Sequence, residues 1–404
     1  MKKLLILIFL ILNIRLMLYP ITNHPTDSVI NVIQSKPVTY PIRFVFMGDN
    51  RNSDSIPPGL MGDGDSTFSA LRNVIDNIYP SPYFAINNGD FCLDGYRYEY
   101  YKYVAMIDSS VVPWLSIRGN HELYADEGPF LYDSIFGDTD FVFDYGNARF
   151  IMMSDCQQHP MSDWNAIDYL FTYEQLDWLD SLLSDAYIQN KYPLVFAHVP
   201  PYIPGHNTTY CLGYENYYPQ PNYELSHTEL FTNKLTDYNV LLAGFGHQHF
   251  YDRYTYNNVH YIVSGGGGGP LVPPLQSAPY GGSFFHFILF ELYEDGTLKG
   301  YIYKKGQSNP DPDYNFTYYT GIKDNNILAS NDIIIDIINR NDIFYIYSNK
   351  LMENIKIIGI NGQTILERKL NSRSYQFSIP RNRVYFYIIK TKSSIRKGKI
   401  INLK

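Results

Sequence analysis

Short apolar runs alternate with amphipathic segments between residues 42 and 306. The segments Thr67 to Tyr79 and Thr172 to Gln189 carry apolar residues at helical spacing and predict helices. In the second segment, Thr172 and Gln175 have the spacing of a capping box. Strands that alternate with helices are typical of an α/β domain with a largely parallel central sheet. The predicted buried strands are Phe44 to Met47, Tyr83 to Ile86, Trp114 to Ile117, Leu194 to Phe196 and Val240 to Ala243.

The pattern differs at the two ends of this region. Before it, Thr22 to Tyr40 reads as an extended segment. After Gly269, the runs Phe284 to Tyr293 and Leu298 to Lys304 flank Asp295-Gly296, which predicts a long hairpin. We expect this hairpin to close the α/β domain, which would then span residues 42–306.

A different architecture is expected for the C-terminal part of the chain. Residues 307–331 are rich in Asn, Asp, Pro and Tyr without a period, and we interpret them as a linker. Residues 332–404 contain strand-like runs separated by short polar turns, which predicts a small all-β sandwich of the immunoglobulin-like kind. The runs are Asp332 to Ile338, Ile343 to Ser348, Ile355 to Ile360, Thr364 to Lys369, Tyr375 to Ile379, Val384 to Lys390 and Ile395 to Ile401.

Charge separates the same two regions. The chain has 32 Lys and Arg against 40 Asp and Glu, a net charge of -8. Residues 331–404 hold 14 basic and 5 acidic side chains, so the first 330 residues carry a net charge of -17. An acidic body argues against nonspecific nucleic-acid binding, which requires clustered Lys and Arg. We therefore expect nucleic acid only as a substrate, and we expect a monomer.

The first residues have the layout of a secretory signal. Met1-Lys2-Lys3 precedes an apolar stretch from Leu4 to Leu12, and Asn13 and Arg15 end this stretch well short of the roughly 20 residues of a membrane span. We predict a signal peptide over residues 1–21, with an uncleaved anchor as the alternative. The three cysteines allow at most one disulfide bond and do not form a disulfide framework.

Polar residues follow each of the five predicted strands. In open α/β sheets, the functional crevice lies outside the carboxyl ends of the strands. Carboxylates, an amide and imidazoles at that edge are suitable ligands for Zn, Mn or Fe. The strand-end sequences are Gly48-Asp49-Asn50-Arg51, Asn88-Gly89-Asp90, Gly119-Asn120-His121-Glu122, His198 and Gly246-His247-Gln248-His249.

Taken singly, these residues have ordinary structural interpretations. Asp49 or Asp90 alone fits a helix cap or a turn, Asn120 fits a turn, and His198 fits a buried histidine with satisfied hydrogen bonds. Their coincidence at five strand ends favours a shared metal site. A carboxylate that bridges two ions about 3.5–4 Å apart would let them activate a water and neutralise a phosphoryl oxygen.

The ordered set of strand-end motifs resembles the calcineurin-like metallophosphoesterases, and within them the purple-acid-phosphatase-like branch. The resemblance covers residues 42–305. Three further segments within this range also match: Glu174 to Leu179, Phe196 to Tyr202 and the glycine loop Ser264 to Gly269. It implies a four-layer α/β/β/α sandwich and two divalent or trivalent ions of Fe, Mn or Zn. It also implies hydrolysis of phosphomonoesters or phosphodiesters by a metal-bridging hydroxide.

The resemblance assigns a role to each site residue. His121 would protonate the leaving oxygen of the substrate or stabilise its charge. Glu122 and Asp252 would orient the ligand imidazoles. Asp90 would bridge both ions; the other ligands would be Asp49 and His249 for the first ion, and Asn120, His198 and His247 for the second.

Two positions depart from the family pattern. Arg51 stands where many members have a histidine ligand, and Leu93 stands where purple acid phosphatases have a tyrosine ligand. The first ion therefore lacks one protein ligand, which Asn52, Asp54 or water would replace. A guanidinium does not ligate metals, but it suits a bidentate grip on phosphate. We predict that Arg51 binds the substrate phosphate, with a structural salt bridge as the alternative.

The C-terminal runs resemble the sorting domain of the type IX secretion system of Bacteroidetes-type bacteria. The matching features are Ile357 to Gln363, Phe377 to Pro380 and Val384 to Tyr387, although Arg383 replaces the usual glycine before the Val-Tyr pair. The resemblance implies that the secretion machinery is a partner and that the protein is secreted or reaches the outer-membrane surface. An accessory sandwich without a sorting role is the alternative.

Several other features receive structural interpretations. His286 fits a strand histidine, and Gly265 to Gly269 fits a close passage of backbone beside the site. The tyrosines of Tyr96 to Tyr103 predict an amphipathic helical face, and a cleft lining for a sugar or aromatic leaving group is the alternative. Two hypotheses about function remain: a secreted metal-dependent phosphoesterase, or a surface binding protein on the same scaffold whose metal site has degraded.

Overall fold

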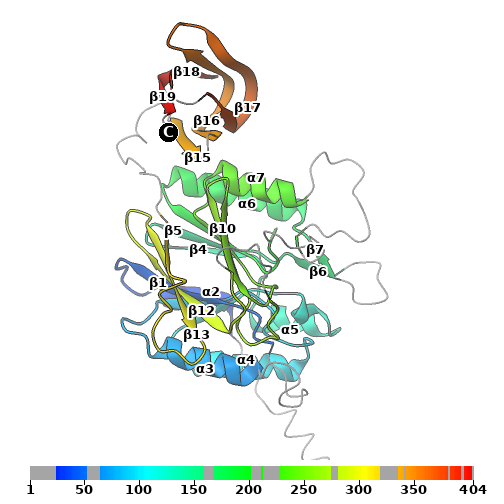
Figure 1. Cartoon of the computed structure of the whole chain (residues 1–404). Coiled ribbons are helices and arrows are strands. Elements are labelled where there is room, and N and C mark those ends of the chain that lie inside the picture. Colours follow the sequence, from blue (N-terminus) through cyan, green and yellow to red (C-terminus); the bar gives the residue numbers. More distant parts are fainter. Residues whose placement is uncertain are drawn as a thin grey trace, which may run out of the picture. The chain divides into compact units, whose positions relative to one another are not determined.

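The computed structural model describes residues 24–51, 64–158, 167–201, 211–212, 227–273, 281–318, 335–340, 343–380, 383–392 and 395–402 (Figure 1). It divides into two compact units, Met1–Gly321 and Ile322–Lys404. The predicted signal peptide, residues 1–21, lies outside the described residues. Among the helices that are described, none has the length and apolar character needed to cross a membrane.

Two six-stranded sheets form the centre of the first unit. The first sheet contains β1 (Ile42–Met47), β2 (Phe84–Asn87), β3 (Trp114–Ser116), β12 (His286–Leu292), β13 (Leu298–Lys304) and β14 (Phe316–Tyr318), in the order β14-β13-β12-β1-β2-β3. The second contains β4 (Phe141–Tyr145), β5 (Ala148–Met152), β8 (Tyr192–Phe196), β9 (Leu242–Phe245), β10 (Tyr251–Tyr256) and β11 (Val259–Ser264), in the order β10-β11-β9-β8-β5-β4. In the first sheet, β1, β2 and β3 are parallel and form one edge, and β12, β13 and β14 continue the sheet in antiparallel pairs. In the second sheet, β11, β9, β8 and β5 form a parallel centre between the antiparallel edge strands β10 and β4.

Helices cover the outer faces of both sheets (Figure 1). The first sheet packs against α3 (Gly64–Asp76), α4 (Arg97–Asp108) and α5 (Gly128–Ile135), and the second packs against α6 (Tyr173–Ile188) and α7 (His227–Asp237). A further helix, α2 (Thr26–Gln34), contacts both β3 and β4, which are the edge strands on one side of the two sheets. The unit therefore has helices outside and two sheets inside.

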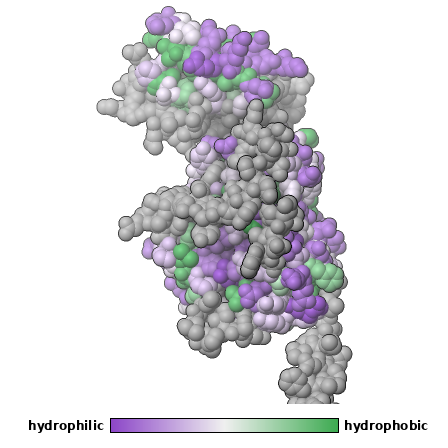
Figure 2. Space-filling model, turned by 90° about the vertical axis from the view of Figure 1, so that its right-hand side faces the viewer, coloured by the Kyte–Doolittle hydropathy of each residue, from purple (hydrophilic) through white to green (hydrophobic). Residues whose placement is uncertain are grey.

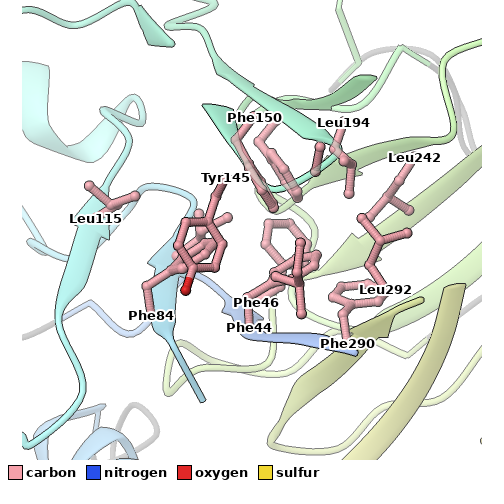
Figure 3. Packing of buried hydrophobic residues seen from close by; sticks show 14 of the residues in the cluster. Phe44, Phe46, Phe84, Leu115, Tyr145, Phe150, Leu194, Leu242, Phe290 and Leu292 are labelled. Carbon is pink, nitrogen blue, oxygen red and sulfur yellow. The ribbon is translucent and has the colours of Figure 1, made fainter. Parts of the chain in front are cut away.

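Aromatic packing holds the two sheets together (Figure 3). The ring of Phe44 on β1 stacks on Phe290 with 5.0 Å between centroids and meets Phe150 of the other sheet edge-on at 5.2 Å. Phe44 and Phe46 face the opposite sheet, while the alternate residues Val45 and Met47 pack under the helices. Burial on both faces explains why this strand is a continuous apolar run.

The structure confirms much of the predicted order and corrects several parts of it. The five predicted strands and the two helices are present, and Thr172 and Gln175 form the expected capping box. The five strands are divided between two sheets, in agreement with the four-layer sandwich that the family resemblance implies rather than with the single central sheet that the apolar runs indicate. The predicted extended segment contains α2, so that prediction is wrong. The predicted linker, residues 307–331, contains β14, which pairs with β13 and therefore extends the first sheet. Residues 319–331 lie outside the described residues.

The C-terminal unit is all β, as expected, but it has fewer and longer strands. They are β15 (Ile335–Arg340), β16 (Ile343–Gly359), β17 (Thr364–Ser378), β18 (Arg383–Thr391) and β19 (Ile395–Asn402). Strand β16 joins two of the predicted short strands into one, and β17 joins another two. The polar residues between them continue the strand, and the pairing shifts register near Met352. The described strands form one connected sheet around a single hydrophobic cluster, so the immunoglobulin-like pair of sheets is not confirmed.

The described surface is polar on the face that Figure 2 shows, and its hydrophobic residues occur in small groups. Exposed large hydrophobic side chains such as Val111, Phe130 and Ile188 are far apart in the sequence. Scattered apolar residues of this kind are ordinary on a soluble surface. The predicted monomer stays a prediction.

Candidate metal centre

The carboxyl ends of five strands from both sheets converge on one site. Strands β1, β2 and β3 lead into the first three polar segments, and β8 and β9 lead into the other two. Three of the predicted ligands, Asp90, His198 and His247, present ligand atoms within 4.8 Å of one another. Asp49, Asp90 and His249 form a second such group. Asp90 belongs to both groups, and this is the arrangement that two ions with a shared carboxylate require.

The backbone is strained at the predicted site residues. Asp49, Arg51, Asp90 and His247 have φ angles of 61°, 45°, 52° and 63°. Among the described residues, the other non-glycine positions with positive φ are all asparagines, which tolerate this region better. Strain of this kind persists only where the surrounding structure imposes it, and it concentrates at functional sites. The sharp turns are thus made by the predicted site residues themselves, and not only by the glycines before them.

Buried polar atoms without hydrogen-bond partners mark the centre of the site. Among the described residues, Asp49 Oδ1, Asp90 Oδ2, His198 Nε2 and His249 Nε2 are all buried and make no hydrogen bond. Burying unpaired carboxylate and imidazole atoms is costly unless a cation or water satisfies them. Oxygen and imidazole nitrogen atoms are also the donors that Zn, Mn and Fe accept. The donor set therefore fits two such ions.

The distances between donor atoms agree with this fit. His198 Nε2 lies 3.1 Å from Asp90 Oδ1, and His247 Nδ1 lies 2.9 Å from Asn120 Oδ1. In the other group, His249 Nε2 lies 3.4 Å from Asp49 Oδ1. Two donors that bind one ion at right angles, each at about 2.1 Å, are about 3 Å apart.

Backbone carbonyl groups orient the imidazole rings. His198 Nδ1 donates to the carbonyl oxygen of Asn88 at 2.8 Å, and His249 Nδ1 donates to that of Pro270 at 2.7 Å. His121 Nδ1 donates in the same way to Leu93. These hydrogen bonds leave Nε2 of each ring directed at the site.

The expectation that Glu122 and Asp252 orient the ligand rings is wrong. The buried Glu122 carboxylate accepts backbone N–H groups of Asp90, Cys92 and Gly119 at 2.9, 2.8 and 2.8 Å. Burial, together with the negative charge of Asp90, raises the pKa of Glu122 to about 8. Glu122 therefore fixes the loops that carry Asp90 and Asn120. The Asp252 carboxylate accepts the N–H of Arg253.

Positively charged side chains around Asp90 shift the pKa values of the site residues. Burial would raise the pKa of Asp90, but the charges of His198, His121 and Arg51 outweigh burial and hold this pKa well below its usual range. For His198, burial opposes protonation, yet Asp90 raises the pKa of the ring to about 10. Burial and the charge of His198 lower the pKa of His247 well below its usual value. Asp90 therefore keeps its negative charge, while the His247 ring is held neutral.

The two predicted catalytic residues lie beside the shared carboxylate. Arg51 Nη2 is 3.6 Å from Asp90 Oδ2, and its side chain is 19% exposed. His121 Nε2 is 3.7 Å from the same oxygen, and its backbone N–H donates to Asp90 Oδ1 at 3.0 Å. Burial lowers the pKa of His121, and Arg51 lowers it further, while Asp90 opposes this change. Asn52 and Asp54, the predicted substitutes for the missing ligand, lie outside the described residues.

The glycine loop passes close to the backbone of the first ligand, as predicted. Gly267 N donates to the carbonyl of Gly48 at 2.8 Å, and Gly269 N donates to that of Asp49 at 2.7 Å. A Cβ atom on Gly267 would lie 2.3 Å from the Gly48 oxygen. The loop therefore holds the backbone of Asp49 by hydrogen bonds, and a side chain at position 267 would prevent this close approach.

Sequence reasoning missed two residues that hold the ligands. Asp155 accepts the backbone N–H groups of His198 and Val199 at 3.3 and 2.7 Å, and it follows β5, a strand that was not predicted. Its signal was present, because Asp155 ends the apolar run that begins at Phe150. Tyr124 accepts a hydrogen bond from the Asn120 amide at 2.7 Å, and no motif indicated it.

We predict that the chain binds two ions and that single substitutions remove them selectively. Asp90→Asn should weaken both sites, His249→Ala only the first, and His198→Ala only the second, by about tenfold or more in affinity. Metal content after dialysis against Mn²⁺ or Zn²⁺ measures this, and circular dichroism checks folding. His260→Ala is the control, because this ring stacks on Tyr318 away from the site. Loss of both ions from either His249→Ala or His198→Ala would contradict the two-site assignment.

Comparison with known proteins identifies the family. The model of the calcineurin-like phosphoesterases matches residues 42–251, just over half of the chain. No curated protein sequence matches the chain. A purple acid phosphatase from yellow lupin (Lupinus luteus) seeds is similar in structure, with a TM-score of 0.50 and 19% identity over 68% of this chain and 53% of that one. This chain therefore spans little more than half the length of the lupin enzyme.

A second solved structure is similar over nearly its full length. A dimetal phosphatase from Danio rerio gives a TM-score of 0.50 and 17% identity, covering 69% of this chain and 99% of that one. At these identities the two structures show a common fold. The chain belongs to the calcineurin-like phosphoesterase family.

Proposed function

We propose that this protein hydrolyses phosphate monoesters or diesters with two ions of Fe, Mn or Zn. The observation that carries the proposal is the pair of donor groups that share Asp90. The family and the two phosphatases of similar fold support it. Bound ions would supply an activated water and neutralise charge on the phosphoryl oxygens.

Two residues beside Asp90 would bind the phosphate group and protonate the leaving oxygen. The Arg51 guanidinium is partly exposed beside the shared carboxylate, where it would bind two phosphate oxygens and hold the ester in place. Because Nδ1 donates to Leu93, a proton on Nε2 makes the ring a cation, the form that the charge of Asp90 favours. In that form His121 would donate the Nε2 proton to the leaving oxygen as the P–O bond breaks, while water forms the new P–O bond. The hydrogen bond from His121 Nδ1 to Leu93 fixes the ring for this transfer.

The two ion sites would differ in strength. The first has Asp49, Asp90 and His249, because Arg51 and Leu93 occupy the positions of the missing family ligands. The second has Asp90, His198, His247 and the amide of Asn120. With one protein ligand fewer and a guanidinium nearby, the first ion should be held more weakly.

Turnover with added metal tests the proposal. Protein loaded with Mn²⁺, Zn²⁺ or Fe²⁺ should hydrolyse para-nitrophenyl phosphate or its bis ester, and a chelator should abolish the activity. Asp90→Asn and His247→Ala should each lower kcat by at least about 10³-fold, because each disrupts the centre that activates water. If no metal supports turnover and fewer than one ion binds per chain, the protein would instead be a binding protein on a degraded scaffold.

Arg51 and His121 should affect different kinetic constants. Arg51→Ala should raise KM about tenfold or more, which corresponds to about 1.4 kcal/mol of binding, while Arg97→Ala on the surface should change nothing. His121→Ala should lower kcat about 10²–10⁴-fold on an alkyl phosphate, whose leaving group needs a proton. On para-nitrophenyl phosphate the fall should be at least about tenfold smaller. An equal fall on both substrates would rule out the proton-donor role.

We also propose that the protein is exported and that residues 332–404 address it to the type IX secretion machinery. The supporting observations are the signal-like start and the basic, all-β C-terminal unit. In a host with this machinery, the full chain should reach the cell surface or the medium, and a variant that ends at residue 331 should accumulate in the periplasm. Metal-dependent hydrolysis by that variant would show that it is folded. Its appearance at the surface would contradict the sorting role.

A further inference from the structure

An asparagine that binds a metal ion must present its oxygen. The two ends of an amide have nearly the same shape, but only Oδ1 has a lone pair for the ion, whereas Nδ2 carries two hydrogen atoms. A flipped amide would direct N–H groups at the ion and repel it. A site that uses Asn120 therefore needs a group that distinguishes the two orientations.

Tyr124 is placed to make this distinction. Its hydroxyl oxygen accepts a hydrogen bond from Asn120 Nδ2 at 2.7 Å, and on the other side Asn120 Oδ1 lies 2.9 Å from His247 Nδ1. A short helical turn, η1 (His121–Leu123), separates the two residues. Across this turn the Tyr124 hydroxyl reaches back to the Asn120 amide.

The surroundings hold the Tyr124 hydroxyl in position. The Tyr124 ring packs edge-on against His121, with 4.5 Å between centroids. Burial raises the pKa of Tyr124 to about 12, so the phenol stays neutral over the working range of the enzyme. Asn120 itself is only 2% exposed, which leaves little room for water to accept its N–H groups instead.

We propose that Tyr124 is a positioning residue that fixes the Asn120 amide with Oδ1 towards the second ion. The inference rests on the proposed two-ion centre and adds a residue to it that none of the strand-end motifs contains. It concerns binding of the second ion, because Asn120 belongs to the Asn120–His247 side of the site. The first ion, between Asp49 and His249, should be unaffected.

A double-mutant cycle tests the proposal. Tyr124→Phe retains the ring but removes the acceptor, and it should weaken the second ion about tenfold or more while changing the first less than about twofold. Asn120→Asp replaces the amide with a carboxylate, whose two oxygens are equivalent, so orientation no longer matters. In that background Tyr124→Phe should change the affinity less than about twofold. Titration with Zn²⁺ or Co²⁺, followed by calorimetry or absorption, measures both sites.

The cycle separates positioning from packing. If Tyr124→Phe has the same effect in the wild-type and Asn120→Asp backgrounds, or no effect in the wild-type background, the proposal is wrong. Tyr103→Phe is the matched control, because it also removes a buried phenol hydrogen bond, to Ser116, without touching a ligand. Tyr124→Leu, in the same two backgrounds, replaces Tyr124→Phe if that variant does not fold. Failure of the wild-type protein to bind two ions would count against the metal centre itself, which is a different result.

Discussion

The site depends on the Asp90 carboxylate, which is fully buried yet shared by two groups of metal donors. Its backbone has a φ of 52°, a conformation that a non-glycine residue adopts only under constraint. Glu122 supplies part of that constraint by accepting the N–H of Asp90, and Arg51 supplies more by donating its N–H to the Asp90 carbonyl. A charge of this kind is tolerated in the interior because cations surround it.

The two-sheet architecture explains how so many ligands reach one carboxylate. Asp49, Asp90 and Asn120 follow strands of one sheet, whereas His198, His247 and His249 follow strands of the other. The aromatic layer around Phe44 fixes the distance between the sheets and so the distance between the two ligand sets. Where loops from the two sheets meet, the contact is close: a Cβ on Gly246 would lie 2.4 Å from Asp49 Oδ2. Small changes in sheet packing would therefore move the donors apart.

The strand-end motifs predicted which residues come together, whereas the apolar runs alone left part of the fold unpredicted. Ligand residues are visible because each follows a short apolar strand, and the carboxyl ends of such strands meet. The partition into two sheets was not visible in the apolar runs alone, since strands buried on both faces look alike in either sheet. Helix α2 was missed because it has few apolar residues. Residues such as Val29 and Ile33 are buried only by their packing against the sheet edges, which the local sequence does not reveal.

Supporting contacts were the least predictable part. The carbonyls of Asn88, Leu93 and Pro270, which orient three imidazoles, carry no side-chain signature. The role of Glu122 was misassigned for a related reason, because its partners are backbone N–H groups. Such contacts depend on where loops meet in space. The type of chemistry can therefore be predicted from the ligand side chains. The exact positions of these side chains depend on backbone carbonyl and N–H groups, which every residue type except proline offers in full.

Diffraction from crystals soaked in Mn²⁺, recorded at the manganese absorption edge, tests the central claim most directly. Two anomalous peaks should appear about 3.5–4 Å apart, one beside Asp49 and His249 and the other beside Asn120, His198 and His247, with the Asp90 carboxylate between them. The peak beside Asp49 should be the weaker, since Arg51 and Leu93 replace ligands on that side. A single peak, or two peaks that do not share Asp90, would contradict the account.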